Sequence, residues 1–180
     1  MSTAKNFRVS ALEVTKFFLS LDPERKYFVK EKLIKKGDNS SPMIGNLRLN
    51  KLLQITQILY AAKEENWLFP EKFLAFEHGG VIYEIYRQFH FLVDSQNSTP
   101  IKNLTPALES FLTKIYHYFK TYTNQQLKDF VHEDPAWFNT WEERKTLRIQ
   151  SQTMPKNSEM LKYYRNFALH IVELVELQEI

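Results

Sequence analysis

Residues 47–65, LRLNKLLQITQILYAAKEE, are the stretch of the chain that decides the fold class. Apolar side chains recur there at the three- and four-residue spacing of one helix face. Neither glycine nor proline interrupts the stretch, so nothing in it favours a break. It therefore predicts one long helix. The residues that share its apolar face are Leu49, Leu52, Leu53, Leu59 and Tyr60.

Sequence patterns that are typical of helix N-termini occur on both sides of this segment. Ser10 with Glu13, and Thr123 with Gln126, have the spacing of a capping box, in which two side chains satisfy backbone N–H groups at a helix start. Both pairs are followed by apolar residues at helical spacing. Each therefore predicts the start of an amphipathic helix.

Two Asp-Pro pairs predict helix starts of another kind. Aspartate is a favoured N-cap residue, and proline is well tolerated at the first helical position. Asp22-Pro23 thus predicts a helix that runs to about Lys36, and Asp134-Pro135 predicts one that carries Trp137.

The whole chain is predicted to be a single domain, residues 1–180, of all-α or mostly α class. Only four of its 180 residues are glycine, too few for the many tight turns of a large β-sandwich or barrel. We expect a compact bundle of about six to eight helices. A short apolar run near residues 73–78 leaves open one short β segment, and Gly79-Gly80 after it predicts the chain reversal.

Composition excludes several kinds of protein. The net charge of +3, from 24 basic against 21 acidic residues, is too balanced for an obligate nucleic-acid binder. The absence of cysteine excludes disulfides, cysteine-based zinc sites and a thiol nucleophile. The start of the chain lacks the apolar run of a signal peptide, and no stretch approaches the ~20 apolar residues that cross a bilayer. We expect a cytoplasmic protein with no membrane contact.

A basic cluster lies between Arg25 and Lys36. Glu24 and Glu31 partly offset its charge, which favours a solvated face over a surface that follows phosphates. The alternative stays open, and its candidate nucleic-acid contacts are Lys32, Lys35 and Lys36.

His132-Glu133-Asp134 is the densest group of possible metal ligands or acid–base residues. If His78 or His117 lay near this group in the fold, the residues together could support metal-assisted hydrolysis. Adjacent helical residues do not share a face, however, and the HExxH spacing is absent. The simpler interpretation is that Asp134 caps a helix and His132 hydrogen-bonds within a loop. No nucleophile motif is present either. The sequence therefore predicts no enzyme activity, no metal and no cofactor.

Two aromatic pairs are candidates for a partner-binding surface. Trp137 and Trp141 lie one helical turn apart, and Tyr163 and Tyr164 are adjacent. Tryptophan and tyrosine are enriched in interface hot spots. They are also common core residues, and we expect the core placement for both pairs.

Several segments together carry a resemblance to a known family: residues 47–53 with Gln57 and residues 67–69, residues 75–89 (AFEHGGVIYEIYRQF), residues 127–137, and the closing helix around Met160 and Tyr163-Tyr164. They resemble, in the same order, segments of the Panacea domain, which is found in SocA-like antitoxins and phage-associated GepA-type proteins. They span about residues 10–170. The positions that match the family pattern, most of them structural in character, are Asn50, Lys51, Gly79, Gly80, Tyr86, His132 and Trp137.

Three departures identify the chain as a divergent member. Gln54 stands where the family has tyrosine, Gly79-Gly80 replaces Gly-Pro, and Val131 replaces threonine. The resemblance implies a bacterial or prophage protein of a toxin–antitoxin system. It would neutralise a toxin encoded nearby by direct binding, with a role as proteolytic adaptor left open. The alternatives are a nucleic-acid-binding regulator and, less favoured, a metal-assisted hydrolase around His132. The oligomeric state and the binding surface stay open.

Overall fold

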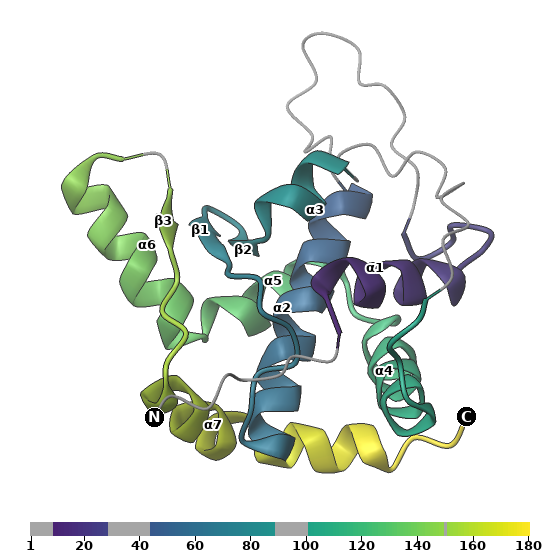
Figure 1. Cartoon of the computed structure of the whole chain (residues 1–180). Helices are drawn as coiled ribbons and strands as arrows, with labels where there is room; N and C mark the ends of the chain where they lie inside the picture. The colour runs from purple at the N-terminus through teal and green to yellow at the C-terminus, as the bar shows by residue number, and fades with distance from the viewer. Residues whose placement is uncertain (1–8, 29–43, 89–100, 150) are drawn as a thin grey trace, which may run out of the picture.

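The decisive segment forms α2, Ile44–Glu64, which passes through the centre of the molecule (Figure 1). The structure is a computed structural model that describes residues 9–28, 44–88, 101–149 and 151–180. Helix α2 packs most extensively against α7, Ser158–Glu176, and next against α5, Asn124–His132. The long helix predicted from the sequence is confirmed.

The remaining helices surround α2, and the mostly helical class is confirmed. Within the described ranges no helix combines the length and the mean hydropathy that crossing a membrane requires. The other helices there are α1 (Ala11–Ser20), α3 (Tyr83–Gln88), α4 (Pro106–Phe119) and α6 (Pro135–Leu147).

A small antiparallel sheet lies beside α2. Its strands are β1 (Leu74–Phe76), β2 (Gly79–Val81) and β3 (Gln152–Thr153), in the order β2-β1-β3. The short β segment expected near residues 73–78 is thus confirmed. The chain reverses at Glu77-His78 and not at the glycines, because Gly79 pairs with Phe76 inside the hairpin. The placement of the turn at Gly79-Gly80 was wrong.

Three of the four predicted helix starts are present. The side chains of Ser10 and Thr123 cap α1 and α5, each with the reciprocal bond of a capping box. Asp134 is the N-cap of α6, and its Oδ1 accepts the backbone N–H of Ala136 at 2.9 Å. Removing such caps usually costs about 1 kcal/mol of stability each.

Asp22 does not start a helix, which corrects the fourth prediction. Its carboxylate accepts the backbone N–H groups of Lys26, Tyr27 and Phe28 at 2.8, 2.8 and 2.7 Å. The carboxylate therefore holds a bend, with Arg25 in the left-handed backbone region at φ 53°. The rest of the helix predicted as far as Lys36 lies outside the described residues.

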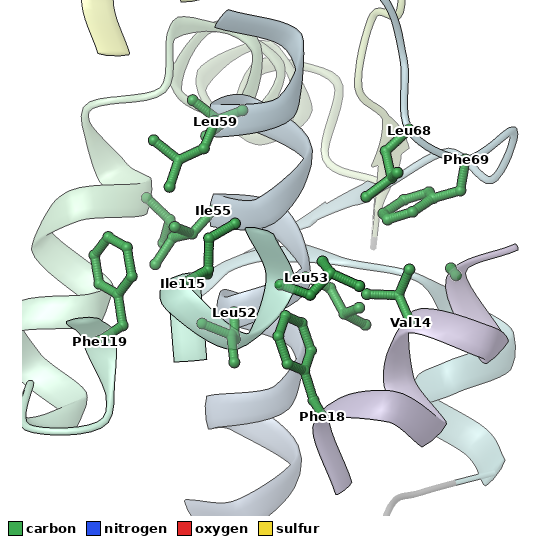
Figure 2. Close-up of a cluster of buried hydrophobic side chains, with 14 of the residues drawn as sticks. Val14, Phe18, Leu52, Leu53, Ile55, Leu59, Leu68, Phe69, Ile115 and Phe119 are labelled. Carbon is green, nitrogen blue, oxygen red and sulfur yellow. The ribbon is translucent and has the colours of Figure 1, made fainter. Parts of the chain in front are cut away.

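The apolar face of α2 supplies the centre of the core (Figure 2). Leu52 and Leu53 lie near Phe18 of α1, and Ile115 and Phe119 of α4 approach the same helix. All five side chains are fully buried. Complete burial of one such side chain stabilises the fold by about 1.5–3 kcal/mol, so this face fixes how α1 and α4 pack against α2.

Candidate functional site

A second face of α2 is polar and equally buried. It carries Asn50, Lys51, Gln54 and Gln57, none of which is more than 4% exposed. Their spacing places them along one side of the helix, which faces the β1–β2 hairpin and the segment that leads to it. Buried polar groups need partners, and the partners here are backbone groups of those segments.

Each amide on this face pairs with backbone that is not part of α2. Gln54 Oε1 accepts the N–H of Gly80 at 2.6 Å, and Asn50 Oδ1 accepts the N–H of Ile82 at 3.3 Å. Gln57 Oε1 accepts the N–H of Leu68 at 3.1 Å. The side chains of α2 thus fix the position of the hairpin.

Lys51 is the charged member of this face. Its side chain is 1% exposed, and its Nζ donates to the carbonyl oxygen of His78 in the hairpin turn. Burial, and then the positive charge of Lys128, lower the pKa of Lys51 from 10.5 to about 7. At neutral pH the ammonium and the neutral amine are therefore comparably populated.

Asp134 joins three helices through one carboxylate. It is completely buried. Its Oδ2 accepts Gln54 Nε2 at 2.9 Å, and its Oδ1 accepts the hydroxyl of Tyr164 at 2.9 Å. Burial raises the pKa of Asp134, while these hydrogen bonds act in the opposite direction. Burial and the nearby carboxylate raise the pKa of Tyr164. The network ties α2 and α7 to the start of α6.

The two glycines are required by close contacts. A Cβ on Gly79, where φ is 122°, would lie 2.8 Å from Cγ2 of Val131. A Cβ on Gly80 would lie 2.9 Å from Gln54 Oε1 and 3.0 Å from the sulfur of Met154. The hairpin can approach α2 and α5 this closely because both residues lack a side chain.

Trp137 packs against the hairpin, and His132 stacks on Trp137. Their rings stack with centroids 3.9 Å apart and an angle of 8°. Trp137 Nε1 donates to the carbonyl oxygen of Phe76 at 2.8 Å, and Tyr86 stacks on the Phe76 ring at 6.1 Å. Burial, followed by the charges of Lys51 and Lys128, lowers the pKa of His132 to about 4.

The structure therefore brings the seven positions that carry the family resemblance to one place, the β1–β2 hairpin and its supports. Sequence reasoning treated Gln54 only as a departure from the pattern and did not place Gln57 or Tyr164 in this network. A usable signal exists: polar residues at 50, 51, 54 and 57 follow helical spacing in a helix that is otherwise apolar.

The structure does not bring His132, Glu133 and Asp134, the three residues of the hydrolase hypothesis, together at one site. Asp134 is buried as a cap, His132 lies flat on Trp137, and Glu133 is exposed at the C-cap of α5. Among the described residues no three His, Asp or Glu side chains gather as a metal site. His132 Nε2 has no hydrogen-bond partner in the described part of the chain.

Only the beginning of the basic cluster belongs to the described residues. Arg25 Nη1 donates to the carbonyl oxygen of Leu19 at 2.6 Å, and Lys26 pairs with Glu24. Both side chains therefore have partners within the chain. Lys32, Lys35 and Lys36 lie outside the described residues, so nucleic-acid contact through them stays a prediction.

Two cavities differ greatly in size. One, between Gln54, Asp134 and Tyr164, has a volume of about 20 Å³, which is the space of a single water. The other is an open groove of about 690 Å³ bordered by Tyr27, Arg48 and Tyr122 among others. The Arg48 guanidinium lies 4.1 Å from the centroid of the Tyr27 ring and donates to the carbonyl oxygen of Tyr122, so it is engaged in holding the groove wall.

Helix α7 has an apolar stripe on its outer side as well as an inner face. The inner face, which includes Tyr164, is buried against the core. The outer stripe consists of Tyr163 (38% exposed), the half-buried Phe167, Leu174 (44%) and the C-cap residue Leu177 (76%). The spacing of these four residues keeps them on one side of the helix. This is a mostly apolar surface on the exterior of the protein, in which the exposed His170 lies between Phe167 and Leu174.

The aromatic pairs are divided between core and surface. Trp137 and Tyr164 are buried, as expected, and Trp141 packs partly buried against the core. Tyr163 is exposed and stacks on Phe167 at 5.7 Å. The core placement expected for both pairs was thus wrong for Tyr163, because adjacent helical residues face different directions.

Comparison with known proteins gave no match: no family model, no curated protein and no solved structure is significantly similar to the chain. The membership in the Panacea family therefore stays a prediction from the ordered motifs.

Proposed function

We propose that the chain is an antitoxin-like protein-binding module that neutralises a toxin encoded nearby. In this proposal it is a bacterial or prophage protein that acts in the cytoplasm and occludes its toxin by direct contact. The observation that supports binding is the outer stripe of α7. Large apolar side chains that line one exposed helix face are typical of a surface that binds another protein.

The stripe fits the centre of a helix-in-groove contact. Its residues are spaced four, seven and three apart, and a groove on a partner recognises apolar anchors at such intervals of one helix face. Phe138 of α6, at 51% exposure, is a further exposed aromatic residue. A specific complex buries about 1,200–2,000 Å² in total. The stripe alone supplies only the hot spot, and polar residues around it complete the interface.

The ordered motifs support the antitoxin assignment in a different way. The residues that carry the resemblance lie around the hairpin, where most of them are buried and hold the fold. In this proposal the resemblance reflects a shared scaffold. Partner choice in this proposal resides instead in the exposed residues of α7.

Co-expression with the product of the adjacent gene tests the proposal. The tagged chain should co-purify with that product in a stoichiometric complex and restore growth to cells that express it. Leu174→Glu and Leu177→Glu should each abolish both effects, since a charge in the apolar contact is desolvated without a partner. Leu169→Glu is the matched control, because Leu169 is an exposed leucine of α7 that lies off the stripe.

One result would remove the whole proposal, and another would remove only its assignment of the binding surface. One is that no complex and no rescue occur with the unaltered chain. The other is that the stripe variants bind and rescue as well as Leu169→Glu does. In the second case the chain binds a partner, but not through this surface.

A further inference from the structure

Four basic side chains around the turn of the β1–β2 hairpin lie close enough for their charges to interact and form what we call the turn cluster: Lys51, His78, Lys128 and His132. They come from three elements, namely α2, the hairpin turn and α5. Lys51 Nζ donates to the carbonyl oxygen of His78 and lies 3.3 Å from the position of a Cβ on Gly79. Lys128 and His132 are four residues apart and share one face of α5.

The contact between α5 and the hairpin brings the cluster together. Cγ2 of Val131 lies 2.8 Å from the position of a Cβ on Gly79, so the backbone of the turn meets α5 between Lys128 and His132. Lys51 is covered and forms the floor, whereas the other three side chains are half-buried. The cluster is therefore partly exposed to solvent, mainly through side chains other than Lys51.

The members of the cluster repel one another electrostatically. Besides burial, the charges of Lys51, Lys128 and His78 lower the pKa of His132, and those of Lys128 and Lys51 lower that of His78. Two carboxylates act in the opposite direction. Glu77 raises the pKa of His78, and Asp129 raises that of His132, but both pKa values stay below normal. The local potential is therefore positive.

Two ring nitrogens at this place lack partners. His78 Nδ1 and His132 Nε2 are buried and have no hydrogen bond within the described ranges. Buried polar atoms without a partner are uncommon in native proteins and need an explanation. No ion pair joins Lys51 or Lys128 to a carboxylate in those same ranges. Positive charge and unpartnered ring nitrogens thus coincide.

We infer that the turn cluster is an oxyanion-binding site that takes a phosphate- or carboxylate-type group. Lys51 and Lys128 supply ammonium donors, and the two histidines donate through their free ring nitrogens once they are protonated. Hydrogen bonds between charged donors and an anion are about twice as strong as neutral ones. A bound anion also removes the mutual repulsion of the cluster. The inference goes beyond the proposed function and does not depend on the outer stripe of α7.

Titration of the histidines by NMR in the whole protein tests the site. Sodium phosphate is added at pH 6 against sodium chloride of equal ionic strength, and the Cε1–H signals of His78 and His132 are followed. Phosphate should shift both signals saturably and raise both pKa values, because the anion stabilises the protonated rings. Lys128→Gln should weaken this binding by about tenfold. Lys162→Gln, at an exposed lysine of α7, should change it by less than about twofold.

A second titration identifies the source of the oxyanion. A capped Gly-Glu-Gly peptide replaces phosphate under the same conditions. Binding of phosphate alone identifies a free anion or a phosphoryl group, and tighter binding of the peptide identifies an acidic side chain of a protein partner. The inference is overturned if neither probe shifts the two histidines, or if Lys128→Gln and Lys162→Gln bind as the unaltered protein does.

Discussion

Replacing Gln54 by leucine tests whether buried polar side chains of α2 hold the hairpin in place. The change keeps the side-chain size but removes the hydrogen bonds at 2.6 Å to Gly80 N–H and at 2.9 Å to Asp134 Oδ2. Both groups left behind are buried, and an unsatisfied buried group costs about 1–3 kcal/mol. The two losses together predict a stability loss of about 2–6 kcal/mol. In a protein of this size, at about 2–4 °C for each kcal/mol, that lowers Tm by roughly 4–24 °C.

The assay is urea unfolding followed by circular dichroism at 222 nm, with a thermal scan of the same samples. Gln125→Leu is the matched control, because Gln125 is an exposed glutamine that bonds Asp129 at 2.6 Å within α5. We expect the control to change stability by less than about 0.5 kcal/mol. Equal losses of stability in the two variants would refute the reasoning. The loss would then not depend on whether the removed hydrogen bonds are buried.

Three further predictions concern other parts of the fold. Gly80→Ala should destabilise the protein by about 1–3 kcal/mol in urea unfolding, because its Cβ meets Gln54 Oε1 at 2.9 Å; an unchanged midpoint would contradict the close contact. Thr123→Ala should cost about 1 kcal/mol in the same assay through the lost cap of α5, whereas a loss near zero would mean that the cap contributes nothing. Lys51→Met should make stability less dependent on pH between about 7 and 10.5. The folded-state pKa of Lys51 lies below the unfolded value, so the unfolded chain binds more protons there and wild-type stability rises with pH. The free energy of unfolding of both proteins is measured by urea unfolding across that pH window. If it changes with pH equally in both, the result contradicts the lowered pKa.

Much of the fold could be predicted because local signals and tertiary packing agree. The apolar spacing in residues 47–65 gave the central helix, and the side chains of Ser10, Thr123 and Asp134 gave three helix starts. Asp22 has the same Asp-Pro signature as Asp134 but binds three backbone N–H groups of a bend. A cap signature shows that a carboxylate will bind nearby N–H groups. It does not show whether the chain beyond them is helical.

The site was harder to predict because its members come from distant parts of the chain. Gln54 and Asp134 are 80 residues apart in sequence, and only the folded structure reveals their contact. The turn was misplaced for a related reason. Gly79 and Gly80 are needed because the hairpin lies close to Val131 and Gln54. This requirement comes from contacts between distant parts of the chain, so the sequence around the glycines does not indicate it. The sequence likewise could not predict that His132 Nε2 has no hydrogen-bond partner among the described residues.

The central claim is that buried residues around the hairpin build the fold while the outer stripe of α7 binds the partner. The most direct test measures the Kd of the purified complex with the adjacent gene product for Leu174→Glu and Gln54→Leu, at a temperature where both are folded. We predict that Leu174→Glu keeps the wild-type Tm and binds at least about a hundredfold more weakly, as expected for loss of a hot spot. Gln54→Leu should lose Tm and keep its affinity. Wild-type affinity for Leu174→Glu would contradict the claim.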